Sequence, residues 1–344
     1  MHSFGGLCLL RPCPLRVHPW AEMKAIQIQK TGGPEVLRIA EVPIPEPGPG
    51  QVLIRVEAAG VNFIEIYFRK GTYKAALPYI PGSEAAGTIE ELGPGVTGFK
   101  PGESVASTSV LGSYAEYALV PAAQLVKVPD ALSPEQAAAA MLQGMTAHYL
   151  SHSTWPLKAG ETALIHAGAG GVGLLLTQMA KERGARVITT VSSEEKAGLS
   201  REAGADEVIR YTEQDFEAEV KRITGGRGVD VVYDSVGKTT FEKSLGCLRP
   251  RGLLALFGGS SGPVPPFDLI RLSGLGSLYV TRPTLWHYVA TREELEWRSG
   301  EVLNAVACGK LKLRTEFTYP LDQAAQAQIA MESRMTTGKI LLQP

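Results

Sequence analysis

The stretch "HAGAGGVG", residues 166–173, places Gly168, Gly170 and Gly173 at the spacing G-x-G-x-x-G. A strand-like segment precedes it and a helix-like segment follows, which is the context that gives this motif its meaning. The glycines permit a tight turn, a close approach of the backbone to a pyrophosphate and close packing of the helix, whose N-terminus offers free N–H groups. The stretch therefore predicts a dinucleotide-binding turn that opens a βαβ unit.

Strand-like and helix-like segments alternate from about residue 133 onward, which is typical of a parallel, doubly wound sheet. The first helix is expected within residues 133–152, because Ser133 is a typical N-cap and Pro134 a typical first helical residue. The strand-like segments are residues 162–168, 185–191, 206–211, 229–237 and 252–258, and the helices between them are expected to begin near Gly171, Glu194, Glu213 and Thr240.

Residues 23 to about 129 consist of short alternating segments broken by Gly and Pro, which is typical of a β-rich barrel or sandwich. In "QVLIRVEA", residues 51–58, three aliphatic side chains recur at every second position and fall on one face of a strand. Beyond about residue 291, we expect helices within residues 292–309 and 321–333 and a terminal strand within residues 338–344. The sequence thus predicts an α/β protein with a β-rich part and a doubly wound part.

The overall composition favours small-molecule partners. A chain of 344 residues with 44% hydrophobic content is long enough to bury two domain cores. The net charge of -1 creates no field that would gather nucleic acid or a membrane surface. No apolar run approaches the roughly 20 residues that span a bilayer.

Residues 1–22 differ in character from the rest and contain two of the four cysteines, Cys8 and Cys13. We interpret them as an N-terminal extension that is disordered or not native, with an organelle-targeting peptide as the alternative, because strand-like alternation begins at Met23. The remaining Cys247 and Cys308 suit a reducing compartment, which predicts a cytoplasmic location.

The end of the second strand of the βαβ unit indicates which dinucleotide would bind. NAD-binding proteins usually carry an acidic residue there, whereas this strand is followed by Ser192, Ser193 and, shortly after, Lys196. Hydroxyls and an ammonium group suit a 2′-phosphate, which a carboxylate would repel. This stretch favours NADPH. The alternative for Lys196 is a solvated helix lysine, and Glu194 and Glu195 are expected to point to solvent at the helix start.

Seven motifs resemble the medium-chain dehydrogenases/reductases, and among them the zinc-free NADPH:quinone oxidoreductases of the zeta-crystallin type. These are "GGPEVL", "GVNFIEIYFRKGTY", "PGSEAAG", "AGAGGVG", "VVYDSVG", "SLYVTRP" and "ESRMTTGK". The resemblance implies a GroES-like β-rich catalytic domain, residues 23–145, a doubly wound Rossmann domain that binds NADPH, residues 146–285, and a return to the catalytic domain over residues 286–344. It also implies a homodimer joined through the Rossmann sheets, which we assign to the strand within residues 276–280.

The motif "PGSEAAG" bears on metal chemistry. Zinc alcohol dehydrogenases of this superfamily carry a histidine ligand at the position of Ser83, and the cysteine ligand expected after "AAGVN" is also missing. Catalytic zinc needs three protein ligands and structural zinc usually four, so we predict no metal site. Glu84 is then interpreted as a structural carboxylate that accepts hydrogen bonds from nearby backbone or from an arginine. His148 and His166 are likewise interpreted as structural.

The resemblance also implies the site residues. Asn62, Tyr67 and Tyr73 are predicted to be catalytic, and Asn62 and Tyr67 are also expected to meet the nicotinamide end of the cofactor. The other predicted cofactor-binding residues are Thr146, Tyr149, Gly168, Gly170, Gly171, Val172, Gly173, Ser192, Ser193, Lys196, Tyr211, Ser235, Phe257, Gly258, Ser260, Thr281, Arg282 and Arg334.

The predicted activity is NADPH-dependent, metal-independent hydride transfer to quinones. Without a metal, a conjugated acceptor fits best, because it spreads the developing charge and needs only hydrogen-bond donors. Reduction of the double bond of an enone or enoyl thioester is the alternative within enzymes. Binding of AU-rich RNA, or a structural crystallin-like role, is the alternative from another class, and the near-neutral charge disfavours nucleic acid.

Overall fold

The computed structural model describes residues 21–344. The predicted N-terminal extension, residues 1–22, therefore lies outside the described residues except for its last two positions. Glu22 already belongs to strand β1 (Glu22–Gln27), so the first strand begins one residue earlier than the sequence pattern predicted.

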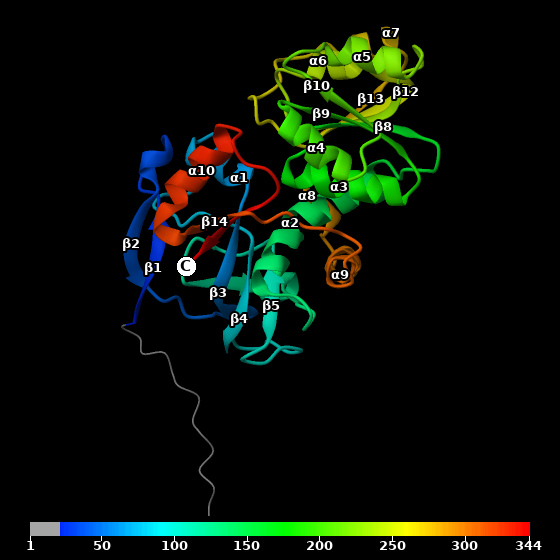
Figure 1. Cartoon of the computed structure of the whole chain (residues 1–344). Helices are drawn as coiled ribbons and strands as arrows, with labels where there is room; N and C mark the ends of the chain where they lie inside the picture. Colours follow the sequence, from blue (N-terminus) through cyan, green and yellow to red (C-terminus); the bar gives the residue numbers. More distant parts are fainter. Residues whose placement is uncertain (1–20) are drawn as a thin grey trace, which may run out of the picture.

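The molecule has two parts, and one of them is a six-stranded sheet in the order β10-β9-β8-β11-β12-β13 (Figure 1). All neighbouring strands in this sheet are parallel, as the alternation of strands and helices predicted. The strand order reverses between β8 and β11, and ligands of such sheets bind at the carboxyl ends of the strands beside this reversal. The strands are β8 (Thr162–His166), β9 (Arg186–Val191), β10 (Glu207–Arg210), β11 (Val229–Asp234), β12 (Leu248–Leu256) and β13 (Tyr279–Thr281).

Helices connect these strands and lie against the sheet. They are α3 (Gly171–Glu182), α4 (Glu194–Glu202), α5 (Phe216–Ile223), α6 (Phe241–Gly246) and α7 (Ile270–Gly274). Helices α8 (Leu285–Tyr288) and α9 (Arg292–Ala307) follow the last strand of this sheet and pack against helix α2 (Pro134–Tyr149). The predicted start of α5 near Glu213 was wrong by three residues. Asp215 accepts hydrogen bonds from the N–H groups of Glu217 and Ala218, so the helix begins after this cap.

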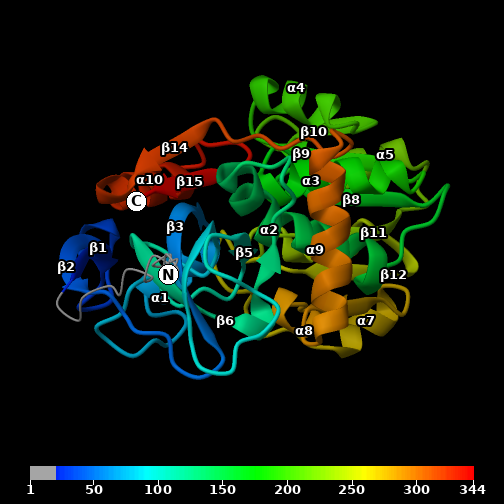
Figure 2. The same cartoon turned by 90° about the horizontal axis from the view of Figure 1, so that it is seen from below.

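The other part is β-rich and is built from both ends of the chain (Figure 2). Its main sheet has the order β14-β15-β3-β4-β5-β7, with β6 also paired to β3. The terminal strand β15 pairs antiparallel with β3, so the last strand of the chain lies beside a strand from its N-terminal part. The strands here are β1, β2 (Arg38–Pro43), β3 (Gln51–Val61), β4 (Ala85–Leu92), β5 (Ser104–Ser107), β6 (Tyr117–Pro121), β7 (Val126–Lys127), β14 (Phe317–Pro320) and β15 (Ile340–Gln343), with helices α1 (Phe63–Arg69) and α10 (Ala324–Glu332).

Helix α2 (Pro134–Tyr149) joins the two parts. Ser133 caps it as predicted, since its side chain accepts a hydrogen bond from the N–H of Gln136. The helix is buried along most of its length and contacts β3, β4 and β5 on one side and α3 and α9 on the other. One apolar core therefore runs from the β-rich part through α2 into the parallel sheet.

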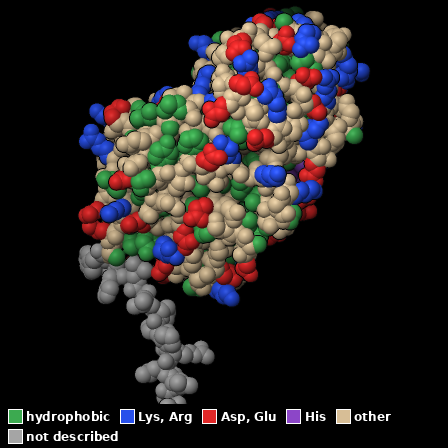
Figure 3. All heavy atoms as spheres, in the orientation of Figure 1, with side chains coloured by type: hydrophobic (Ala, Val, Ile, Leu, Met, Phe, Trp, Pro, Cys, Tyr) green, Lys and Arg blue, Asp and Glu red, His purple; other side chains and the backbone are tan. Residues whose placement is uncertain are grey.

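The outer surface shows mixed charge. On the described part of the face in Figure 3, acidic and basic side chains are intermingled over both parts of the molecule. Among residues 21–344, no helix has the length and apolar character that crossing a membrane requires.

Candidate active site

A cleft of about 970 Å³ runs between the two parts, at the carboxyl ends of the parallel strands. Its wall contains all the predicted site residues except Gly168, Ser193 and Thr281. Residues that were not predicted also line it, among them Phe63, Ile64, Leu142, Gln143, Trp286 and Glu332. Several of these adjoin predicted residues in the sequence, so their proximity to the motifs was the available signal.

The glycine turn forms the floor of the cleft beside β8. A Cβ atom on Gly173 would lie 2.3 Å from the carbonyl oxygen of Ala167, and one on Gly168 would lie 2.6 Å from Cβ of Thr189. A larger residue at either position would clash, so both positions require glycine. Gly168 packs against Thr189 and does not line the cleft. Gly171 and Val172 open α3, whose first N–H groups have no acceptor within the helix. The turn therefore fits a pyrophosphate group.

Two cationic side chains meet at one end of the cleft. Lys196 is half-buried, and its Nζ donates a hydrogen bond to the carbonyl oxygen of Arg334 at 2.6 Å, while Arg334 donates to the hydroxyl of Tyr211 at 3.4 Å. Burial, together with the nearby Arg334, lowers the pKa of Lys196. Glu194 turns away from this end and pairs with Arg201 at 2.7 Å. The end of the cleft is thus suited to an anionic group.

Consecutive serines at the end of β9 have different roles. Ser192 lines the cleft, whereas the side chain of Ser193 accepts a hydrogen bond from the N–H of Lys196 and caps α4. Ser193 was predicted to bind the cofactor, and the structure instead places its hydroxyl on the helix that carries Lys196.

Aromatic hydroxyls gather at the other end of the cleft. Tyr67 and Tyr73 pack edge to face with ring centroids 5.4 Å apart. The hydroxyl of Tyr67 accepts a hydrogen bond from the N–H of Gly259 at 3.1 Å, which leaves its own hydrogen free to be donated into the cleft. Burial raises the pKa of Tyr67, so the hydroxyl stays protonated at neutral pH.

Comparison with known proteins shows which family has this arrangement. Residues 48–130 match the family described as an alcohol dehydrogenase GroES-like domain, and residues 171–295 match the family described as a zinc-binding dehydrogenase. A 2-haloacrylate reductase from a Burkholderia species is 46% identical over 328 residues, which cover 93% of this chain and 98% of that protein. A quinone oxidoreductase from Pseudomonas aeruginosa is 46% identical over 323 residues, which cover 93% of this chain and 99% of that protein.

A solved structure gives the same result. The Escherichia coli quinone oxidoreductase complexed with NADPH is 44% identical and superposes with a TM-score of 0.92, covering 93% of this chain and 100% of that chain. The chain belongs to the quinone oxidoreductase family. Its predicted architecture, a GroES-like β-rich domain and a Rossmann domain, is confirmed.

In this quinone oxidoreductase family member, Glu84 is part of a buried hydrogen-bond network. Its carboxylate accepts hydrogen bonds from the N–H of Leu142 at 2.5 Å and from Asn62 Nδ2 at 2.9 Å, and it pairs with Lys339. The interpretation of Glu84 as a structural acceptor of backbone hydrogen bonds is confirmed, but the cation is a lysine, not an arginine. Ser83, at the position of the zinc ligand in alcohol dehydrogenases, donates to Glu65 Oε1 at 3.2 Å.

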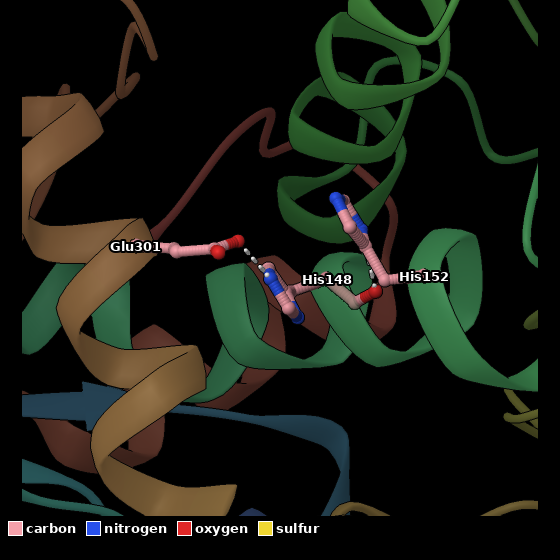
Figure 4. Close-up of side chains that lie close together, drawn as sticks. All are labelled: His148, His152 and Glu301. Carbon is pink, nitrogen blue, oxygen red and sulfur yellow. Dashed lines mark hydrogen bonds and ion pairs between the residues drawn. The ribbon is translucent and has the colours of Figure 1, made fainter.

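His148, His152 and Glu301 are the one group of His, Cys, Asp and Glu side chains within residues 21–344 whose spacing could suit a metal ion (Figure 4). The sequence analysis interpreted His148 as structural without considering His152, four residues later. Neither histidine nor Glu301 lines the cleft. The two imidazole rings are stacked 4.1 Å apart and nearly parallel, so their lone pairs do not converge on one point.

The hydrogen bonds of His148 also favour a structural role. Arg298 donates to its Nδ1 at 3.1 Å, so the neutral ring carries its hydrogen on Nε2 and donates it to Glu301 at 2.7 Å. His152 donates from Nδ1 to the carbonyl oxygen of His148 at 3.0 Å. This group therefore holds α9 against α2. His166 is buried with both ring nitrogens in hydrogen bonds to Thr190 and Ser244, which is also a structural arrangement.

The Glu65 carboxyl makes stability depend on pH. It is 2% exposed, and burial raises its pKa from 4.5 to about 7. The unfolded chain loses this proton first as pH rises, so the free energy of unfolding decreases between these two values. Glu65→Gln mimics the protonated form and does not titrate. We therefore expect the difference in unfolding free energy between Glu65→Gln and the unmutated protein to shift by roughly 3 kcal/mol in favour of the variant as the pH rises from 4 to 8.

Urea unfolding at a series of pH values measures this difference, with Glu90→Gln on the exposed side of β4 as the control. A difference between Glu65→Gln and the unmutated protein that stays constant across this range would contradict the expectation.

Proposed function

We propose that this protein is a metal-independent reductase that transfers a hydride from NADPH to a quinone. The observation that carries the proposal is one continuous cleft, with the pair Lys196 and Arg334 at one end, the glycine turn in the middle and the Tyr67 hydroxyl at the other end. Similarity to quinone oxidoreductases over nearly the whole chain supports it.

The cleft residues fit NADPH in three places. Lys196, Arg334 and Ser192 would hold the 2′-phosphate, because two cations and a hydroxyl meet there. The first N–H groups of α3, at Gly171 and Val172, would hold the pyrophosphate. The nicotinamide end would be met by Asn62, Tyr67, Thr146 and Phe257, which all line the cleft. NADPH, when bound, supplies the hydride.

The protein's own residues would orient the acceptor and stabilise charge. The ring of Phe63 lies 6.5 Å from that of Tyr67, and with the apolar side chains of Ile64 and Trp286 it lines the cleft and excludes water. The free hydrogen of the Tyr67 hydroxyl can be donated to an acceptor oxygen as negative charge develops there. Tyr73 holds the Tyr67 ring by edge-to-face packing. Catalysis then rests mostly on orientation.

Reduction of an activated carbon–carbon double bond is the second candidate. Similarity to the 2-haloacrylate reductase favours it, since that name describes a conjugated alkene as the substrate. Nucleic acid is not a proposed partner, because the net charge is -1. The two free cysteines in the described residues, Cys247 and Cys308, suit a cytoplasmic location.

The test of the proposed function is an assay with NADPH and a panel of quinones, simple enones, 2-haloacrylate and an enoyl-CoA, each with and without a chelator. We expect the highest kcat/KM with quinones and no loss of activity in the chelator. A preference for alkenes would support the second candidate, and loss of activity in the chelator would overturn metal independence.

We also propose a homodimer formed through β13, the last strand of the parallel sheet. Tyr279 and Val280 in this strand are 58% and 37% exposed, and Leu269 and Ile270 at the start of α7 are 72% and 76% exposed. An exposed apolar sheet edge tends to pair with another strand, and a second copy of the same strand is the symmetric partner.

The NADPH preference depends on Lys196. We expect Lys196→Ala to lower the NADPH-over-NADH ratio of kcat/KM by about 5- to 150-fold, equivalent to about 1 to 3 kcal/mol for one charge-assisted contact. Steady-state kinetics with both cofactors measures the ratio. Lys221→Ala on α5, outside the cleft, is the matched control. Equal use of NADPH and NADH by the unmutated protein would contradict this expectation.

The Tyr67 hydroxyl assists the reaction. We expect Tyr67→Phe to leave the Kd for NADPH nearly unchanged and to lower kcat by no more than about 10²- to 10³-fold, the effect of losing one oxyanion-type donor. The loss should be smaller for strongly oxidising quinones than for simple enones. Tyr319→Phe in β14 is the control. If rates stay unchanged for every substrate in Tyr67→Phe/Tyr73→Phe, solvent is the proton donor instead.

The proposed dimer edge is open to a direct test. We expect light scattering to report a dimer for the unmutated protein at micromolar concentration and a monomer for Val280→Asp, because a charge on the edge strand prevents pairing. Ile329→Asp, which changes an exposed apolar residue of α10 away from this edge, should stay dimeric. A monomer in the unmutated protein would argue against the interface.

A further inference from the structure

A buried ion pair lies behind the wall of the cleft at the Tyr67 end. The side chains of Glu84 and Lys339 are 0% and 2% exposed and contact each other directly. They pack over Gly60 of β3, where a Cβ atom would lie 2.0 Å from Glu84 Oε2 and 2.8 Å from Lys339 Nζ. Glycine at residue 60 thus leaves the space that the pair occupies.

The ion pair fixes the orientation of the Asn62 amide. Lys339 Nζ donates to Asn62 Oδ1 at 2.8 Å, and Asn62 Nδ2 donates to Glu84 Oε2 at 2.9 Å. An ammonium group can only donate and a carboxylate can only accept. If the amide were flipped, its NH₂ group would face the Lys339 ammonium and its oxygen would face the Glu84 carboxylate, and neither hydrogen bond could form. Asn62 is 5% exposed and lines the cleft. Its Nδ2 also donates to the carbonyl oxygen of Gly60 at 3.5 Å, but the shorter contacts to the ion pair dominate and determine which edge of the amide lies where.

The same ion pair is connected to both sides of the glycine turn. The N–H of Leu142 donates to Glu84 Oε1 at 2.5 Å, and the next residue, Gln143, packs so closely on Gly171 that a Cβ atom there would lie 1.9 Å from the Gln143 amide oxygen. On the other side, the N–H of Gly338, the neighbour of Lys339, donates to the carbonyl oxygen of Ala169 at 3.1 Å. Displacing either charged residue would therefore move Asn62 relative to the turn.

We propose that Glu84 and Lys339 are positioning residues that hold the Asn62 amide at a fixed orientation and distance from the phosphate-binding turn. The proposal rests on the proposed function, in which the nicotinamide end of a cofactor bound at the turn would lie beside Asn62. Hydride transfer needs reacting atoms roughly 3 to 3.5 Å apart, and a displacement of about 1 Å can lower the rate on the order of 10²-fold.

Stability alone does not account for this arrangement. Replacing a buried ion pair with neutral side chains of similar volume is often neutral or stabilising, because burying two charges has a large desolvation cost. Removing one partner would leave an unpaired buried charge and destabilise the fold. The test therefore changes both residues together, as Glu84→Gln/Lys339→Met, which keeps the side-chain volumes close to the originals.

In this double variant, the Asn62 amide should change its orientation. The carbonyl oxygen of the amide introduced at position 84 would accept from the N–H of Leu142, which turns the introduced NH₂ group toward Asn62 Nδ2, so two donors would face each other. The matched control is Asp230→Asn/Arg249→Met. This control removes an ion pair that lies outside the cleft. Asp230 is also buried and also accepts a backbone hydrogen bond, from Thr162 at 2.8 Å, and its second partner, Arg227, is exposed to solvent and so is not left as a buried charge.

The first readout is the side-chain amide spectrum of the protein without cofactor. The chain contains two asparagines, Asn62 and the exposed Asn304, so selective ¹⁵N-asparagine labelling gives two NH₂ signal pairs, which Asn304→Gln assigns. We expect the Asn62 pair to have widely separated proton shifts in the unmutated protein. In Glu84→Gln/Lys339→Met, this separation should shrink, or the Asn62 signal pair should appear in two forms. In the control, the signal pair should stay unchanged.

The second readout separates binding from turnover. In Glu84→Gln/Lys339→Met we expect kcat for quinone reduction to fall about 10- to 100-fold, with the Kd for NADPH and the KM for quinone changed by no more than about 3-fold. The control should keep its kcat. An unchanged Asn62 signal, an unchanged kcat, or an equal loss of kcat in the control would each overturn the positioning role.

The two readouts also keep this proposal separate from the proposed function. If the unmutated protein reduces no acceptor in the panel with NADPH, the proposed function fails. The Asn62 signal, measured without cofactor or substrate, still decides whether the ion pair orients the amide.

Discussion

The close approach of backbone to backbone at the glycine turn is the constraint on which the rest of the site depends. The Ala167 carbonyl oxygen lies where any side chain at residue 173 would be, so β8 and α3 can join only through glycine. This contact directs the first N–H groups of α3 into the cleft at the point where the strand order of the parallel sheet reverses. The positions of the cationic end, with Lys196 and Arg334, and of the Tyr67 end are both set relative to this turn.

The second constraint is the position of the C-terminal strand β15 beside β3, a strand from the N-terminal part of the chain. Pairing of β15 with β3 brings Lys339 beside Asn62, which is 277 residues away in the sequence. The segment just before β15 passes the glycine turn, where the N–H of Gly338 donates to the carbonyl oxygen of Ala169, and before that it supplies Arg334 to the cationic end of the cleft. One short stretch near the C-terminus therefore supplies Arg334 and Gly338 to the cleft and Lys339 to the layer behind its wall.

Features that depend on neighbouring residues could be predicted from the sequence, and features that depend on distant ones could not. Strand and helix alternation predicted the parallel sheet, and the Ser133 cap predicted the start of α2. The roles of Ser192 and Ser193 could not be separated, because a shift of one residue at the end of β9 exchanges which serine faces the cleft. Glu84 was recognised as a structural acceptor from its surroundings, but its cation, Lys339, is fixed by β15 and not by any local pattern.

The charges behind the cleft wall limit what the protein can contribute to the chemistry. Lys339 is the buried cation that contacts Asn62, but Glu84 neutralises it, so it offers little field to an oxygen that gains negative charge in the cleft. Glu65, held by Ser83 and the Asn62 backbone, has its pKa raised to about 7 by burial, so it remains largely protonated below that pH and adds little charge. Within the cleft, negative charge can be stabilised by hydrogen-bond donors such as Tyr67, by Arg282, which lines the cleft and acts electrostatically on Tyr67, and by the acceptor itself. Acceptors that delocalise charge well are the ones that such a site can reduce, which is why a conjugated substrate fits this cleft better than a simple carbonyl compound.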